Sequence, residues 1–365
     1  MPFPAPVTLL LALACARSPV ASPEAPLRPA PVAHAAPIAN AAPRDEDAAE
    51  AAEEAAEDRA DEEAAQKGPM VPAPPHEPIP ADIGVVFFGD AGTGHWRQRR
   101  VADRIGEFCA TARCDAVALL GDNFYPSGVT STTDPQWQSK FVDVYGRLGL
   151  PFHAALGNHD YLGDPGAEVG WQVPPGTPST WDMPSRTYTW TLGPITFIVL
   201  DTSRPTEDQK AWYKRQLGAA RTQWTVTYGH HPLWSGGQHG DTTDLESWSD
   251  LIESGDLYLC GHDHDQEVIH RPGLVEVVMG TGGAGLRPIA AAPGAKLARE
   301  GFGFGYLSVK GDRLYVTVVD DDGAVVATSS WTQAQIEAAD QPGGPDVSPP
   351  VPAGAGGVAP HPAKR

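Results

Sequence analysis

Short apolar runs that end in glycine followed by aspartate, asparagine or histidine recur through the middle of the chain. Each run is rich in β-branched and other apolar residues, as expected for a buried β-strand. The polar ends of five of these runs are Gly89-Asp90, Gly121-Asp122, Gly157-Asn158-His159, Gly229-His230 and Gly261-His262-Asp263-His264. The carboxyl ends of strands line the ligand crevice of an open α/β sheet, and a glycine there permits a tight turn. The pattern therefore predicts that these polar side chains meet in one site.

Segments with helical spacing of apolar residues lie between the strands, at residues 96–112, 135–148 and 207–220. The alternation of strands and helices predicts an α/β domain. A closing pair of strands over residues 305–331 turns at polar and glycine residues, as a hairpin would.

The first residues of the chain resemble an export signal. Residues 7–14 form an apolar run that is too short to cross a bilayer but suits the core of a signal peptide, and Cys15 follows directly. Residues 1–21 are therefore predicted to be either a signal peptide or a lipoprotein signal with a lipid anchor on Cys15. Both interpretations predict export, to the cell surface, the periplasm or the medium. Because no Lys or Arg precedes Arg17, a plain apolar N-terminus is a third interpretation.

The segments that flank the middle of the chain contain few residues that can form a core. Residues 41–68 hold 11 acidic and 3 basic residues, within a chain whose net charge is −20. Residues 22–80 are predicted to be a disordered tether and residues 336–365 a disordered tail, with the folded domain at residues 81–335. The acidic balance and the lack of a Lys/Arg cluster argue against nucleic-acid binding.

Three cysteines remain in the predicted domain, Cys109, Cys114 and Cys260. They are too few for a disulfide framework and lack the Cys-x-x-Cys spacing of many metal sites. Two interpretations of Cys109 and Cys114 remain: a local bridge formed in an oxidising compartment, or two small unpaired apolar side chains.

The strand ends carry a family resemblance. The motifs "GDAG", "GDNFY", "GNHD", "GHHP" and "GHDH" resemble the five signature blocks of the calcineurin-like metallophosphoesterases. The longer matches "GDNFYPSGV", "GNHDY", "GHHPLWSGGQHG" and "CGHDH" are similar to the purple acid phosphatases, in particular the small, tartrate-resistant form. The resemblance spans about residues 82–331. It implies the metallophosphoesterase fold, a four-layer α/β/β/α sandwich of two mixed sheets flanked by helices, acting as a single catalytic domain.

The same resemblance implies a centre of two metal ions. The residues that it assigns to the first ion, Fe(III), are Asp90, Asp122, Tyr125 and His264. The residues that it assigns to the second ion, a divalent Fe, Zn or Mn, are Asp122, Asn158, His230 and His262, with Asp122 bridging. The chemistry agrees, because two carboxylates and a phenolate suit a hard trivalent ion, whereas a nitrogen-rich set suits a divalent one.

Two further histidines, His159 and His239, match positions where the family contacts the phosphate or protonates the leaving group. His159 is the candidate general acid, because an imidazolium beside the ester oxygen is protonated in acid. His231 is expected to be a neighbour of the site. The implied function is a dinuclear-metal acid phosphatase that hydrolyses phosphomonoesters by in-line attack of a metal-bound hydroxide, with an acidic pH optimum. The expected substrates are small phosphate esters or phosphorylated macromolecules, and a monomer is expected.

Two alternative functions remain. A metal-dependent phosphodiesterase or nucleotide hydrolase would use the same fold with a wider cleft, although Tyr125 favours the monoesterase. A surface-tethered metal-binding protein without catalysis is less favoured, because every implied ligand position holds a residue of the expected type.

Two other segments are predicted to lie at the site. "GTGGAG", Gly280 to Gly285, formally matches a dinucleotide-binding pattern, but no helix or ribose-binding acid clearly follows it. A glycine-rich rim on the cleft is the preferred interpretation. Residues 172–188 are predicted to be either a substrate-facing loop, with Trp181, Met183 and Arg186 available for contact, or a plain surface loop.

Overall fold

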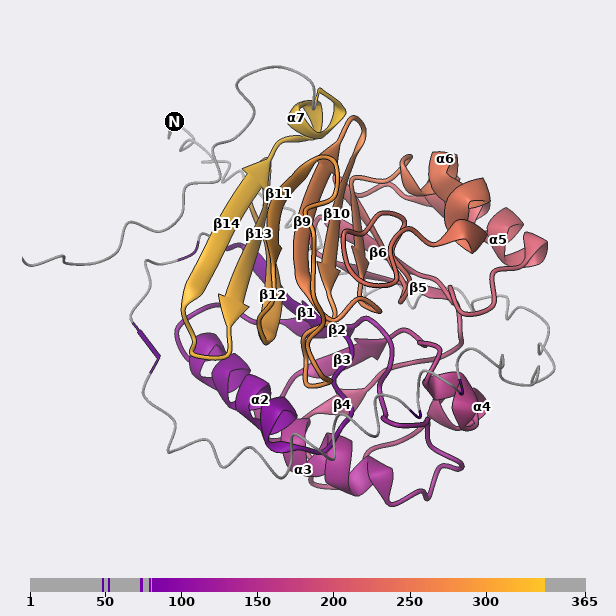
Figure 1. Cartoon of the computed structure of the whole chain (residues 1–365), viewed down its shortest axis with the longest axis vertical. Helices are drawn as coiled ribbons and strands as arrows, with labels where there is room; N and C mark the ends of the chain where they lie inside the picture. The colour runs from indigo at the N-terminus through magenta and orange to yellow at the C-terminus, as the bar shows by residue number, and fades with distance from the viewer. Residues whose placement is uncertain (1–47, 49–51, 53–72, 75–78, 80, 339–365) are drawn as a thin grey trace, which may run out of the picture. The chain divides into compact units, whose positions relative to one another are not determined.

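Two β-sheets packed face to face, with helices outside them, form the folded part of this computed structural model (Figure 1), which describes residues 48, 52, 73, 74, 79 and 81–338. The predicted signal at residues 1–21, with Cys15, lies outside the described residues, as do most of the predicted tether and tail.

The first sheet is mixed. Its spatial order is β14-β13-β12-β1-β2-β3-β4. Strands β1 to β4 pair in parallel, while β12, β13 and β14 continue the sheet antiparallel beside β1. The bounds are β1 Ile83–Phe88, β2 Ala116–Leu119, β3 Pro151–Ala154, β4 Thr180–Trp181, β12 Gly303–Lys310, β13 Arg313–Asp320 and β14 Val325–Trp331.

The second sheet is also mixed. Its order is β11-β9-β10-β8-β7-β6-β5, and β6, β7, β8 and β10 are parallel to their neighbours within this group. The bounds are β5 Tyr188–Leu192, β6 Ile195–Val199, β7 Trp224–Tyr228, β8 Leu257–Cys260, β9 Gln266–Arg271, β10 Leu274–Met279 and β11 Ala295–Arg299. The prediction of two mixed sheets flanked by helices is confirmed.

The central strands are buried on both faces, which explains their nearly continuous hydrophobicity. In β8, Leu257 and Leu259 belong to the main core, which draws on both sheets, whereas Tyr258 and Cys260 belong to a second, smaller core. That second core also contains Tyr213 of helix α5 (Glu207–Ala219). Side chains of a strand alternate between its faces, so one strand serves both cores.

The helices lie where the sequence predicts them. Helix α2 (Trp96–Cys109) packs on the first sheet, where Phe108 meets Tyr306 of β12 edge to face, with ring centroids 4.9 Å apart. Helix α5 starts at Thr206, whose hydroxyl accepts the N–H of Gln209 as an N-cap. The shorter elements are η1 Trp137–Val142, α3 Asp143–Tyr145, η2 Gly146–Leu148, η3 Asp160–Leu162, α4 Pro165–Glu168, η4 Thr243–Trp248, α6 Ser249–Ile252 and α7 Gln333–Glu337.

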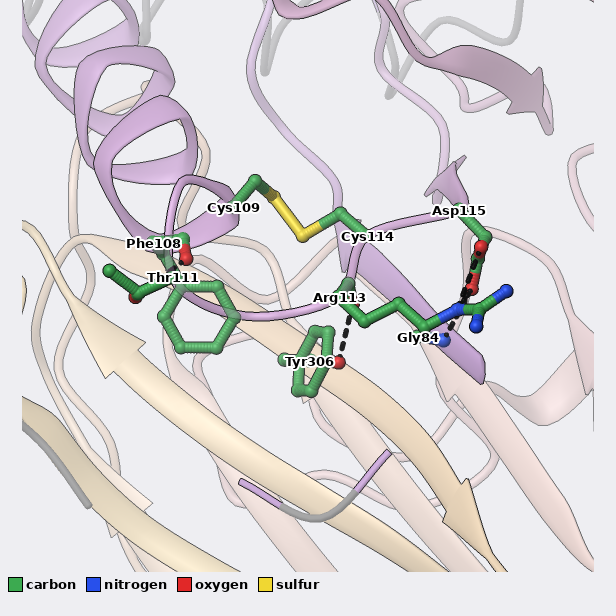
Figure 2. The surroundings of a disulfide bond; sticks show 8 residues. All are labelled: Gly84, Phe108, Cys109, Thr111, Arg113, Cys114, Asp115 and Tyr306. Carbon is green, nitrogen blue, oxygen red and sulfur yellow. Dashed lines mark hydrogen bonds and ion pairs between the residues drawn. A yellow bond between two sulfur atoms is a disulfide. The ribbon is translucent and has the colours of Figure 1, made fainter. Parts of the chain in front are cut away.

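Cys109 and Cys114 form a disulfide that closes the turn between α2 and β2, with the two Cα atoms 5.5 Å apart (Figure 2). The turn is also held to the sheet, because Tyr306 donates a hydrogen bond to the carbonyl of Arg113 (2.6 Å). Of the two interpretations, the local bridge is the one that the structure contains. It precedes β2, at the opposite end of that strand from Asp122.

Three details of the predicted organisation are wrong. The boundary at residue 335 divides helix α7, whose Ile336 is buried in the core. Ile79, at the end of the predicted tether, packs against the same core. The predicted closing pair is three strands, because residues 313–331 turn back between Asp320 and Val325 to form β13 and β14.

Candidate metal centre

The polar residues that follow β1, β2, β3, β7 and β8 meet, as the sequence predicts. Three of them leave their strands in a left-handed backbone conformation: Asp90 has φ 56°, Asp122 φ 50° and His262 φ 71°. This conformation is rare for residues other than glycine, and it persists only where the surroundings fix it, often at functional sites. The chain therefore holds three predicted metal ligands in strained turns.

Tyr125 lies at the centre of the first predicted ligand set. Its hydroxyl oxygen is 3.0 Å from Asp90 Oδ1, 2.8 Å from Asp122 Oδ2 and 3.2 Å from His264 Nε2. A hydroxyl has one proton, so it cannot satisfy two carboxylates and an imidazole nitrogen together. The phenol oxygen, the two carboxylate oxygens and the imidazole nitrogen therefore converge with too few protons to pair them all by hydrogen bonds. Such a set of ligand atoms suits a bound cation.

Backbone carbonyls orient two of the imidazoles. His264 Nδ1 lies 2.6 Å from the carbonyl oxygen of Gly285, and His230 Nδ1 lies 2.9 Å from that of Leu120. A carbonyl only accepts, so Nδ1 carries the proton in both rings and Nε2 faces the site. This is the usual arrangement of a metal-binding histidine.

The second predicted ligand set forms around His230. Its Nε2 is 3.3 Å from Asp122 Oδ2 and 3.0 Å from Asn158 Oδ1. One ligand atom each from Asp90, Asp122 and His230 lie within 4.8 Å of one another. The ring of His262 is 5.1 Å from that of His230, centroid to centroid.

The charges around these histidines also suit metal ligands. Burial by itself would lower the pKa of His230, but Asp122 and Asp90 raise it to about 10, so that a proton on the ring balances the carboxylates when no metal does. Burial and the neighbouring histidines hold the pKa of His262 well below its usual value, which keeps this ring neutral. The donor set therefore fits the two metal ions that the resemblance implies.

The two predicted catalytic histidines occupy different places. His159 is fully buried, with its ring 4.3 Å from that of Tyr125 and its Nε2 3.9 Å from Asp122 Oδ2. His239 is exposed and stacks on His262, with ring centroids 4.3 Å apart. Its Nε2 accepts a hydrogen bond from the guanidinium of Arg287, which itself is 8% exposed. Both therefore adjoin the predicted ligands, His239 from the side open to solvent.

Two residues at the site carry no motif that would have revealed them. Arg287 comes from the segment after the glycine-rich "GTGGAG", and its N–H donates to the carbonyl of His264 (3.2 Å). Thr202 Oγ1 accepts the N–H groups of His230 and His231, each at 3.0 Å, and lies 2.9 Å from His231 Nδ1. Thr202 therefore fixes the turn that carries both histidines, and His231 is a neighbour of the site as expected.

The buried carboxyl of Asp160 holds two of the turns that carry predicted metal ligands. Asp160 Oδ1 accepts the N–H of Asn123 (2.9 Å), and Asp160 Oδ2 accepts that of Gly157 (2.8 Å). Burial and the charge of Asp122 raise the pKa of Asp160 to about 7. Both Asn123 and Asp160 belong to the motifs quoted above, so the sequence could have indicated this role.

The glycine-rich segment packs against the centre. A Cβ on Gly280 would lie 2.2 Å from the carbonyl oxygen of Asp263 and 2.8 Å from Asp90 Oδ2, so only glycine fits. The N–H of Ala284 donates to the carbonyl of Asp90 (2.8 Å). The segment thus has a packing role beside the site, and its residues 280–284 are buried.

The predicted substrate contacts of residues 172–188 are wrong for two side chains. Trp181 and Met183 are buried in the main core, where Trp181 packs on Trp137 with ring centroids 5.1 Å apart. Arg186 is half-buried and donates to the hydroxyl of Tyr161 (3.3 Å).

Known proteins share this fold and sequence pattern. The family model for calcineurin-like phosphoesterase matches residues 83–266. Tartrate-resistant acid phosphatase type 5 of Sus scrofa is 31% identical over 219 residues, which cover 51% of this chain and 64% of that protein. Its Homo sapiens counterpart is 27% identical over 271 residues, covering 62% and 82%.

Two solved structures show the same fold. GAP50, the anchor in the inner membrane complex of Plasmodium, has a TM-score of 0.59 at 21% identity, covering 75% of this chain and 98% of its own. A purple acid phosphatase from yellow lupin (Lupinus luteus) seeds has a TM-score of 0.57 at 18% identity, covering 71% and 55%. The chain belongs to the calcineurin-like phosphoesterase family, in its purple acid phosphatase branch.

Proposed function

We propose that this protein is an acid phosphatase that hydrolyses phosphomonoesters at a centre of two metal ions. The observation that carries the proposal is the convergence of two carboxylates, a phenol and an imidazole around Tyr125, beside the second set around His230. Membership of a phosphoesterase family supports phosphate ester hydrolysis. Tyr125 between Asp90 and Asp122 favours the monoesterase over a phosphodiesterase.

The proposed ligand sets follow the sequence prediction. Fe(III) would bind Asp90, Asp122, Tyr125 and His264, and a divalent Fe, Zn or Mn would bind Asp122, Asn158, His230 and His262. Bound there, the two ions would polarise the phosphoryl oxygens and lower the pKa of a coordinated water.

The chain's own residues supply orientation and charge. The carbonyls of Leu120 and Gly285 hold His230 and His264 with Nε2 toward the centre. On the exposed side, the guanidinium of Arg287 beside His239 offers a fixed positive charge to an anionic phosphate ester. His159 lies against Asp122, where a proton on its ring would adjoin the reacting group.

We also propose that the protein is exported and acts as a monomer on small phosphate esters or phosphorylated macromolecules. The Cys109–Cys114 disulfide supports export, because disulfides persist in oxidising compartments. None of the helices within the described residues is long and apolar enough to cross a membrane.

The substitution Asp122→Asn tests the proposed function. It removes the charge that would bridge both metals, while its side-chain oxygen can still accept the N–H of His159 (2.9 Å in the native chain). We expect phosphomonoester hydrolysis to fall to the background rate and the bound metal to fall with it, measured with an aryl phosphate and by metal analysis. The matched control is Asp312→Asn at an exposed position, which should leave both unchanged. Near-native turnover in Asp122→Asn would contradict the assignment.

A further inference from the structure

Three carboxylates that the proposed function does not use lie beside the candidate metal centre. Asp263, Asp265 and Glu267 occupy alternate positions where the chain enters β9, and all three are fully buried. Ser235 Oγ contacts both Asp263 and Glu267, and Gly237 lies against both Asp263 and Asp265. The fold therefore places three acidic groups together in its interior, where charged groups are costly unless they are paired.

The hydrogen bonds to Asp263 and Glu267 come from neutral groups, one serine hydroxyl and backbone N–H groups. Ser235 Oγ lies 2.5 Å from Asp263 Oδ2 and 2.9 Å from Glu267 Oε1, and it accepts the N–H of Gly237 (2.9 Å). Its single proton can serve only one of the two carboxylates. Backbone N–H groups supply the other donors, since Glu267 Oε1 also accepts the N–H of Gly236 (2.9 Å). These neutral donors do not cancel the charges of neighbouring buried carboxylates, which a cation would.

Asp265 has the least support of the three. Both of its carboxylate oxygens are buried without a hydrogen-bond partner, and so is Glu267 Oε2. A Cβ on Gly237 would lie 2.5 Å from Asp265 Oδ2 and 2.4 Å from Asp263 Cγ, which shows that both carboxylates press on the same residue. The unpartnered Oδ2 of Asp265 therefore lies beside the carboxylate of Asp263.

Asp263 differs from its two neighbours because its oxygens are occupied. Oδ1 accepts the N–H of His239 (2.8 Å), and Oδ2 accepts the hydroxyl of Ser235 and the N–H of Gly240 (3.3 Å). Asp263 thus holds the segment 235–240 in place, and this leaves Asp265 and Glu267 Oε2 as the available ligands.

We propose that Asp265 and Glu267 bind a calcium ion at a site separate from the candidate metal centre. The available donors are all oxygens, which calcium and magnesium prefer, whereas divalent zinc and iron favour sites that include nitrogen or sulfur. Calcium also tolerates irregular coordination completed by waters and carbonyl oxygens, and magnesium does not. The segment 235–240, which covers the cluster, is partly exposed and includes Gly236 and Gly237.

Thermal unfolding of the full-length protein as purified tests this site, with calcium chloride as the probe. We expect Tm to rise by roughly 5–10 °C when free calcium exceeds its dissociation constant about 100-fold. Asp265→Asn and Glu267→Gln should abolish the rise, while Asp312→Asn, at an exposed position, should retain it. In calcium-free buffer Asp265→Asn should be at least as stable as the native protein, because it removes a buried charge that has no partner.

A metal analysis completes the test. One calcium per chain in the protein as purified, lost in Asp265→Asn, would support the site even if added calcium changes nothing further. No calcium in the native protein together with no calcium-dependent rise in Tm would overturn the proposal, and would mean that the carboxyls share protons instead. An equal rise in the native protein and both variants would also overturn it. None of these readouts depends on phosphatase activity.

Discussion

Single residues at the candidate metal centre are fixed through atoms that point away from it. In His264 and His230, Nδ1 donates a hydrogen bond to a backbone carbonyl, and Nε2 points toward the site. Thr202 ties down the turn that carries His230, and Asp160 ties down the turn that carries Asn158 and His159. A ligand held in this way loses little freedom when a metal binds, which favours tight and specific coordination.

The contrasting exposure of His159 and His239 separates their roles. We expect His159→Asn to slow hydrolysis by roughly 10²–10⁴-fold with alkyl phosphates, whose leaving groups need a proton, and by much less with aryl phosphates. His239→Asn is the matched control, because it changes a histidine on the exposed side of the site. The measurement is kcat for a series of leaving groups. An equal loss across the series in His159→Asn would remove its role as general acid, and a leaving-group dependence in His239→Asn alone would transfer that role.

At the level of elements, the site could be predicted because strand ends carry it. Five apolar runs that end in glycine and a polar residue indicate the strands and also the sheet edge at which their carboxyl ends lie. The structure brings the polar residues at these ends together. Strands such as β11, whose residues Ala295–Arg299 are mixed in polarity and only partly buried, give no such signal. Arg287 could not be predicted either, because it reaches the site through an irregular segment rather than from a strand end.

Close packing at the end of β3 makes the site sensitive to one methyl group. A Cβ on Gly157 would lie 2.1 Å from Asp122 Oδ1 and 2.4 Å from the backbone nitrogen of Asp122. We expect Gly157→Ala to displace that carboxylate and to lower kcat/KM for an aryl phosphate by about 10²-fold or more. Gly218→Ala in α5, where a Cβ meets nothing within 4 Å, should keep full activity and gain about 0.5–1 kcal/mol of stability. Full activity in Gly157→Ala would contradict this prediction, because it would show that the turn can accommodate a methyl group beside Asp122.

The whole molecule keeps acidic groups in its interior, and this couples its stability to pH. Glu276 of β10 is buried and accepts the N–H groups of Leu233 (2.7 Å) and Trp234 (3.0 Å). Burial raises its pKa to about 8, although these two N–H groups oppose the change. An unfolded chain would have a pKa near ~4.3 for this group, so the folded state holds the proton more tightly. Stability from Glu276 is therefore full below about pH 4.3 and is lost as the pH rises through 8.

Glu276→Gln isolates that contribution. We expect the variant to be more stable than the native protein at pH 8 by about 1–3 kcal/mol, because it no longer buries a charge, and to show a flatter dependence of stability on pH. Urea unfolding between pH 5 and pH 8 measures this, with the exposed Glu246→Gln as the control. An unchanged slope in Glu276→Gln would show that other groups set the pH dependence.

The proposal that two metals serve phosphomonoester hydrolysis is tested most directly by one measurement on the full chain purified aerobically without added metal. It combines the pH profile of aryl phosphate hydrolysis with the metal content of the same sample. We predict two metal ions per chain, one of them iron, and an acidic optimum, because a trivalent ion keeps a hydroxide nucleophile available in acid. Activity only at neutral or alkaline pH with added divalent metal would contradict the proposed function. It would place Tyr125 among packing residues and favour a phosphodiesterase on the same fold.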